Sequence, residues 1–331
     1  MESFIFGLLV LRIMLSVIGV LGNTVLIVSI LQMTRLKTFE VFLLGLAVSN
    51  LEEIMIVDIY DMIVLRSTHS ISILSCGVLK FMTLSGEVAS IFFTVLISIY
   101  RYQKLHNAAM RIITPIFMDS MKIGVGLSLL CVLVAVLASV PTYIINLDSW
   151  HHMYNSTISD CPADFFQCPR DNCPILNNIY RFLFIFFCYL IPLVIVTGTS
   201  SLIIRILMIQ QKVAELHHNS EPATIAANND HHHHHHNHHH HHDDHHHHHD
   251  HHHHHDHTNV FHRSTIGILA AMMIFQVYCI LYLARHLAFN LYDFPAWSEL
   301  EFFIATFYTA LIPYVYGMGH NFFSLKHFRR Q

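Results

Sequence analysis

The sequence predicts an all-α membrane protein built as a bundle of seven transmembrane helices. Its 331 residues are 53% hydrophobic and only 12% charged, whereas a soluble domain carries about 25% charged residues. Apolar stretches of about 18 or more residues, long enough to cross a bilayer as helices, recur along the chain. We therefore expect one membrane bundle, not the roughly two soluble domains that the length alone would suggest.

We count seven expected spans, in chain order. They cover approximately 4–33, 39–65, 75–105, 122–145, 179–209, 264–289 and 300–320. The first begins with an acidic residue and continues at full span length, so we do not interpret it as a cleavable signal peptide. After the seventh, the stretch "HNFFSLKHFRR" is basic and rich in Phe, which predicts a short amphipathic helix on the inner leaflet.

Lys and Arg in the short loops orient the bundle, because cytosolic loops are enriched in them. One side holds Arg35, Lys37, Lys104, Arg111, Lys122, Lys212, Arg263, Lys326, Arg329 and Arg330. The other side holds Arg12, Arg66, Lys80, Arg170 and Arg181, with Arg285 near a helix end. The first side is therefore cytosolic and the N-terminus faces outward.

Two further features agree with this orientation. The N-x-[ST] glycosylation acceptor Asn155 falls in the loop between spans four and five, which this topology places outside. Four of the seven cysteines, Cys76, Cys161, Cys168 and Cys173, also fall outside, where disulfides persist.

The longest connection, 213–262, divides the chain into three parts. Residues 1–212 form the first five spans, and residues 263–331 form the last two spans and a short tail. The middle segment lacks apolar periodicity and should be a disordered cytosolic loop. It contains the tract His231–His257, which holds 22 of the 32 histidines. Such imidazoles bind zinc or nickel weakly in any case. We favour a tolerated low-complexity expansion over a metal- or pH-responsive modulator, and we assign no metal site or cofactor.

Several positions resemble the markers of class A G-protein-coupled receptors. Span one contains Gly22-Asn23, and span two contains "LAVSN" with Asn50. Cys76 opens span three and the Arg101 of "YRY" closes it 25 residues later, roughly 37 Å along a helix. Pro192 lies in span five, and span seven ends in "IPYVY", from Pro313 to Tyr316.

The departures from that pattern are also informative. Asn50 and Tyr100 stand where class A receptors usually have acidic residues, Ile312 replaces the usual Asn before Pro313, and span six has no proline. With "SIYRYQKLHNAA", this pattern resembles the vomeronasal type-1 receptors, specifically their fish relatives, the class-A-related olfactory receptors. The resemblance implies a pheromone or odorant receptor in the plasma membrane of sensory neurons. It also implies a small-molecule ligand and coupling to an inhibitory-type heterotrimeric G protein, with no enzymatic activity.

The resemblance further implies an activation switch made of Asn23, Asn50, Arg101, Tyr102, Pro313 and Tyr316. Because Tyr100 cannot form the usual local ion pair with Arg101, the resting state must hold Arg101 in another way, or weakly. Cys76 should bridge to the second outer loop. Four outer cysteines allow three full pairings, of which we favour Cys76–Cys173 with Cys161–Cys168.

The candidate ligand contacts are Glu87, Asp58, Asp61, Thr83 and Arg285. Glu87 is the clearest, since an ionisable residue within a span is costly and this one lies about 16 Å down the helix from Cys76. We favour a ligand contact on the pocket floor over a purely structural buried acid.

The outer acids allow more than one interpretation. Asp58 and Asp61 fit a solvated pocket rim equally well. Arg285 and His286 are candidates to pair with these acids or to meet an anionic ligand, and Arg285 could instead extend to the interface.

An alternative function is a zinc transporter with a histidine-rich cytosolic loop. Such a protein needs His or Asp ligands one turn apart within the membrane, and His286 and His320 lie only at helix ends. Duplicated or inverted halves are not evident. No His, Ser and Cys constellation suggests an enzyme. The expected partners are therefore the ligand, a G protein and membrane lipids, and not nucleic acid.

Overall fold

The computed structural model describes residues 2–66, 73–110, 117–153, 175–220, 250–287 and 297–319, and all regular structure within them is helical. The elements are α1 (Glu2–Leu31), α2 (Thr38–Arg66), α3 (Ile73–Ala109), η1 (Phe117–Asp119), α4 (Met121–Met153), α5 (Ile175–Ile185), η2 (Phe186–Leu190), α6 (Ile191–Ser220), α7 (Asp250–Leu287) and α8 (Trp297–Gly319). Because α5, the π-helical turn η2 and α6 follow one another without a break, these elements make seven spans. The predicted seven-helix bundle is confirmed.

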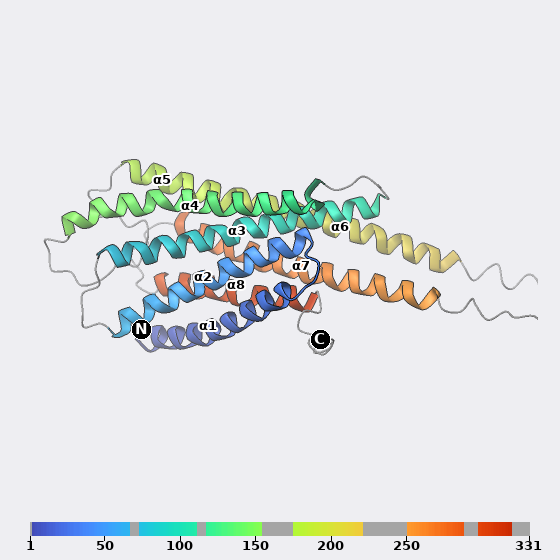
Figure 1. Ribbon diagram of the computed structural model, residues 1–331, viewed down its shortest axis with the longest axis horizontal. Coiled ribbons are helices and arrows are strands. Elements are labelled where there is room, and N and C mark those ends of the chain that lie inside the picture. Colours follow the sequence, from blue (N-terminus) through green and yellow to red (C-terminus); the bar gives the residue numbers. More distant parts are fainter. Residues whose placement is uncertain are drawn as a thin grey trace, which may run out of the picture.

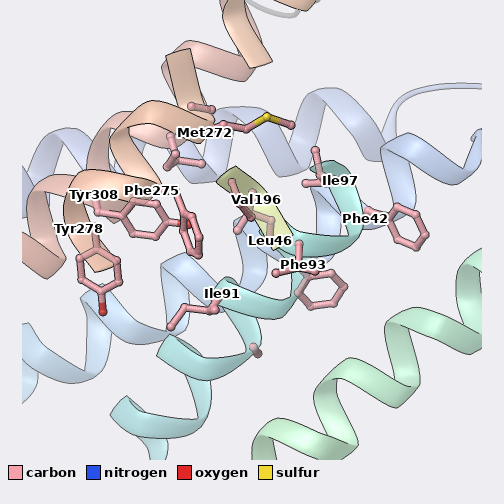
Figure 2. Close-up of a cluster of buried hydrophobic side chains, with 14 of the residues drawn as sticks. Phe42, Leu46, Ile91, Phe93, Ile97, Val196, Met272, Phe275, Tyr278 and Tyr308 are labelled. Atoms are coloured by element: carbon pink, nitrogen blue, oxygen red, sulfur yellow. The ribbon is translucent and has the colours of Figure 1, made fainter. Parts of the chain in front are cut away.

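The helices lie side by side as one elongated bundle (Figure 1). α1 contacts α2 and α8, α8 contacts α7, and α7 contacts α6, while α3 contacts α2, α4, α6, α7 and η2. α3 is therefore the central helix. Figure 2 shows the core around it, where buried side chains of α2, α3, α6, α7 and α8 meet.

Five of the described helices are long and apolar enough to cross a membrane over Val10–Leu31, Gly77–Ala109, Met121–Pro141, Asn178–Val213 and Thr265–Ala284, and α8 has a shorter apolar part, Phe303–Gly317. α2 is a continuous helix, but its apolar sequence is interrupted by Glu52, Glu53 and Asp58. The outward side chains are largely hydrocarbon; Leu129 and Leu137 of α4, for example, are 67% and 59% exposed. Polar groups such as Asn23, Asn50 and Thr94 are instead fully buried, as expected for a protein whose solvent is lipid.

The segment 213–262, expected to be a disordered loop, is helical over 213–220 and 250–262. α6 and α7 extend beyond the other helices at one end of the bundle (Figure 1). Extending an existing helix costs much less than nucleating a new one, since each added residue gains a hydrogen bond. Most of the histidine tract, with the rest of 221–249, lies outside the described residues.

Pro313 of α8 lies at the contact between α1 and α8. Pro313 has no N–H, so the carbonyl of Thr309, four residues earlier, loses its helical donor. Nδ2 of Asn23 donates to this carbonyl at 3.2 Å and to Gly19 O at 2.9 Å. Gly22 makes the approach possible, because a Cβ there would lie 3.1 Å from Pro313 Cγ and 2.6 Å from the Tyr314 ring.

We predict that Asn23→Ala lowers the melting temperature of the purified protein by several degrees. An unpaired buried polar group costs about 1–3 kcal/mol, and this substitution leaves the Thr309 carbonyl unpaired within the bundle. Ser201→Ala is the control, because Ser201 is exposed and its hydroxyl bonds only within its own helix, to Thr197 O. Equal melting temperatures for the two variants would contradict the assignment.

Candidate functional site

Glu87 joins three helices in the interior of the bundle. Its Oε1 accepts a hydrogen bond from the hydroxyl of Tyr189 in η2, at 2.6 Å, and another from the hydroxyl of Tyr278 in α7. Both tyrosines are buried. Hydrogen bonds to an ionised carboxylate are among the stronger ones in proteins, so Glu87 of α3 is a point at which α3, α7 and the fifth span are held together.

The local backbone explains how Tyr189 reaches Glu87. Pro192 would clash with the carbonyl four residues before it in a regular α-helix. The chain forms the wider π turn η2 there, closed by a hydrogen bond from the Ile191 N–H to Phe186 O. Cys188 and Tyr189 are the buried residues of this turn. Such π turns are frequent at functional sites because they change the direction of side chains.

Stacked tyrosines form the walls around the Glu87 carboxylate. Tyr189 stacks on Tyr282 of α7, with ring centroids 3.8 Å apart and planes 5° apart. Tyr278 stacks on Tyr308 of α8, with centroids 4.9 Å apart, and Figure 2 shows these two rings beside Phe275. The Tyr308 hydroxyl is hydrogen-bonded to Thr94 of α3 at 2.8 Å. The aromatic layer therefore connects α7 and α8 to the central helix.

A second acid, Glu53 of α2, lies next to this cluster. Its side chain is only 4% exposed, and its carboxyl is close enough to Glu87 and Glu52 for charge repulsion. Gly86 permits the approach of α2, since a Cβ there would lie 3.3 Å from Ser49 O and 3.4 Å from Glu53 N. The sequence alone did not predict that Glu53 lies close to Glu87.

Asp58 has a partner that the sequence analysis did not consider. It faces Ser16 and Arg12 of α1, and Arg12 is only 2% exposed. The suggested pairing of Asp58 with Arg285 stays a prediction, because the Arg285 side chain lies outside the described ones. Arg12 was counted among the charges of the outer side, but its side chain lies buried within the bundle, near the half-buried Asp58.

Of the remaining predicted ligand contacts, the structure describes the side chain of Thr83 but not those of Asp61 and Arg285. The Thr83 hydroxyl is bonded within α3, to Leu79 O at 3.0 Å. His286 is buried against Tyr282, and its carbonyl accepts a hydrogen bond from Arg181 Nη2 at 3.1 Å. The side chains of Asp61, Arg285 and Cys76 lie outside the described ones, as do Asn155, Cys161, Cys168, Cys173 and the expected C-terminal amphipathic helix.

A cavity of about 420 Å³ opens between α7 and α8. Its rim includes Met273, Val277 and Phe307, which are 54%, 54% and 42% exposed. All three lie in apolar spans, so the cavity faces the hydrocarbon of the membrane. Tyr278 and Tyr308 form part of its wall, but their hydroxyls are bonded to Glu87 and Thr94.

At the cytosolic end, the Arg101 guanidinium lies over the ring of Phe39 in α2, 3.7 Å from its centroid. Glu40 supplies a nearby negative charge. The Tyr100 hydroxyl donates to Asp119 Oδ1 of η1 at 2.8 Å, and Thr38 Oγ1 donates to Asp119 O at 3.1 Å. An aromatic face and acids from other elements thus replace the acidic neighbour that Arg101 lacks.

The other predicted switch residues are divided between the cytosolic end and the interior of the bundle. Tyr316 is buried, with its ring edge-on to Phe39 at 6.5 Å. Asn50 accepts a hydrogen bond from Ser90 Oγ at 2.6 Å, and Tyr102 stacks on His106. The structure brings Arg101, Tyr316 and the unpredicted Phe39 together, while Asn23 and Asn50 lie deeper between helices.

The cytosolic mouth is closed. Arg101, Lys104 and Leu105 of α3, Ile203 of α6, and Thr265 and Ile268 of α7 enclose a cavity of only about 10 Å³. That volume is at the lower limit for one water molecule. No segment of another protein fits between α3, α6 and α7 without a movement of these helices.

Comparison with known proteins is consistent with this architecture. Residues 22–319 match the family described as 7 transmembrane receptor (rhodopsin family). The chain belongs to this family. It is also 30% identical over 156 residues to the C-C chemokine receptor type 1 of Macaca fascicularis. That match covers 46% of this chain and 42% of the relative, so it spans less than half of either protein. The chain is thus a multi-pass receptor of the rhodopsin family, a family of signalling proteins.

We predict that Phe39→Ala raises basal G-protein signalling several-fold at equal surface expression. The ring holds Arg101 in the closed mouth through a cation–π contact, which is worth about 1 kcal/mol. Phe182→Ala is the control, since Phe182 is 59% exposed on the membrane face of α5. Basal signalling equal to that of the parent receptor would show that Phe39 does not restrain Arg101.

Proposed function

We propose that this receptor is chemosensory: it binds a small pheromone or odorant at the Glu87 cluster and activates a heterotrimeric G protein at the mouth around Arg101. The vomeronasal type-1 resemblance supports an inhibitory-type G protein and a location in the plasma membrane of sensory neurons. It rests on Asn50, Tyr100, Ile312 and the "RYQKL" stretch, which are more specific than the family match alone.

The observation that carries the proposal is the position of α7 at both sites. Tyr278 of α7 is bonded to Glu87, and Thr265 and Ile268 of the same helix help to close the cytosolic mouth. Thirteen residues, roughly 20 Å of helix, separate Tyr278 from Thr265. A rigid helix in contact with both sites can transmit a change at one to the other.

The mechanism follows from competition for one carboxylate. A ligand group that binds Glu87 displaces the Tyr278 hydroxyl and removes a contact that holds α7 against α3. The ligand then favours the state in which α7 has moved, because its affinity for that state is higher. Movement of α7 opens the closed mouth and exposes Arg101 to the G protein.

Two other functions receive less support. The relative's name describes a chemokine receptor, but that match covers less than half of this chain. A zinc transporter needs metal ligands inside the bundle, and no group of three or more His, Cys, Asp and Glu side chains gathers in the part of the chain that the structure describes.

We predict that Arg101→Ala abolishes G-protein activation without abolishing ligand binding. Arg101 lies at the cytosolic mouth, on the opposite side of the bundle core from the Glu87 cluster. Activation is measured as ligand-evoked calcium release in cells that express the receptor and a G protein, at matched surface levels. Signalling that persists in this variant would remove the assigned role of Arg101.

We predict that deletion of 229–259 leaves ligand-evoked signalling within a few-fold of the intact receptor, with or without a zinc chelator. The deletion removes a polar segment and the first ten residues of α7, 250–259. This part of α7 extends beyond the other helices (Figure 1), so its loss leaves the contacts within the bundle in place. Loss of the response on deletion would show that the histidine tract takes part in signalling. A chelator effect that disappears with the tract would show the same.

A further inference from the structure

We propose that the Glu87 cluster recognises an organic cation, an amine whose ammonium group lies between the carboxylates of Glu87 and Glu53 against the faces of the surrounding tyrosines. This inference rests on the proposed function and narrows its ligand to one chemical class. The anionic and neutral classes of odorant are the alternatives that the experiment must separate.

The first argument is the charge around the two acids. The Glu53 side chain is only 4% exposed, and among the described residues none donates a hydrogen bond to its carboxyl group. The charges that act on Glu53 from described residues are those of Glu87 and Glu52, both acidic. A buried carboxyl group is stable when it is protonated, whereas its ionised form requires a compensating charge or hydrogen bonds. A ligand cation between Glu53 and Glu87 supplies that charge.

Two cationic side chains lie on neighbouring parts of α1 and α3. Arg12 lies beside Asp58 on the α1 side of α2. Lys80 is buried on α3, but it precedes Glu87 by seven residues, roughly 10 Å along the helix. The tyrosines bonded to Glu87 contribute hydroxyl donors and no charge. A cation between Glu53 and Glu87 therefore meets acids on two sides, whereas an anion would meet repulsion.

The second argument is the aromatic wall. Cations bind over the faces of aromatic rings, and recognition of ammonium ligands by such rings is a common use of this interaction. Tyr189, Tyr278 and Tyr282 are all buried around the carboxylate. Tyr189 stacks on Tyr282, and the Tyr278 ring is tilted against Tyr189, with centroids 6.5 Å apart. An acid combined with these rings provides both the charge and the apolar contact that an alkyl- or arylammonium group needs.

The geometry also connects binding with α7. Tyr278 and Tyr189 both bond to Oε1 of Glu87. An ammonium donor at this oxygen competes with the Tyr278 hydroxyl, whereas an uncharged ligand competes less well, because hydrogen bonds from charged donors are stronger. The proposed ligand charge thus accounts for the release of α7.

The experiment uses the purified full-length receptor in lipid nanodiscs and a charge series of probes. The probes are 2-phenylethylamine, its N,N,N-trimethyl derivative, the neutral 2-phenylethanol and the anionic 3-phenylpropanoate, followed by primary and tertiary alkylamines. A ligand that binds only the folded state raises the melting temperature with its concentration. We expect stabilisation by amines alone. We also expect Glu87→Gln and Glu53→Gln each to weaken the apparent affinity about tenfold or more.

Glu52→Gln is the matched control, since it removes one negative charge from the same turn of α2 at a half-buried position. It should change the amine affinity by less than about threefold, because partly solvated charges are screened. If Glu87→Gln does not reach the surface, Glu53→Gln and the charge series on the parent receptor still decide the question. Equal stabilisation by 2-phenylethanol or 3-phenylpropanoate, or none by any amine, would overturn the proposal.

Calcium signalling measured with the same probes separates this inference from the proposed function. Amines that stabilise the receptor through Glu53 and Glu87 but evoke no G-protein response support the cation site and contradict the signalling proposal. A carboxylate that evokes a response, with amines inactive in both assays, contradicts the cation site and leaves the signalling proposal in place.

Discussion

A bilayer interior offers the chain no hydrogen-bond partners, and this constraint organises the polar residues of the bundle. Many hydroxyls within the spans bond to the carbonyl three or four residues earlier in their own helix, as Ser98 does to Val95 O and Ser139 to Ala135 O. Other polar groups bond across helices. The Thr309 carbonyl freed by Pro313 receives Asn23, and the Glu87 carboxylate receives two tyrosine hydroxyls. The residues that hold the helices together are therefore the same ones that a ligand or a conformational change has to disturb.

Glu87 differs from the other interhelical contacts in the number of helical elements that it joins. Asn23 ties α1 to α8 through a neutral amide, and Ser90 ties α3 to α2 through Asn50. Glu87 instead ties α3 to η2 and α7 through a group that can carry a full charge. A charged group responds more strongly to a ligand than an amide does, because both its hydrogen bonds and its Coulomb energy change. This makes the Glu87 cluster the contact in the described structure best suited to convert binding into movement.

Much of the fold was predictable from local sequence, while the partners within the site were not. Seven apolar stretches predicted the seven spans. Glu87 was identified because an ionisable residue is unusual in such a stretch, and Asn23, Arg101 and Pro313 because they resemble class A markers. Tyr189 and Tyr278 gave no comparable signal, since tyrosines are common in these helices and the two lie 102 and 191 residues from Glu87. Arg12 was counted with the loop charges because counting charges cannot distinguish a loop arginine from one that is buried inside the bundle.

The cytosolic end shows how a missing charge is replaced. Tyr100 occupies the position next to Arg101 where the class A pattern has an acid, and it donates a hydrogen bond to Asp119 of η1 instead of accepting one from Arg101. Arg101 turns to the Phe39 ring, with Glu40 on the same turn of α2. The acid has in effect moved from the arginine's own helix to the neighbouring elements. The restraint on Arg101 then depends on how α2 and η1 sit against α3, and not on one adjacent side chain. In the proposed mechanism, movement of α7 alone leaves Phe39 and Glu40 in place, and a G protein then has to compete with them for the guanidinium as the mouth opens.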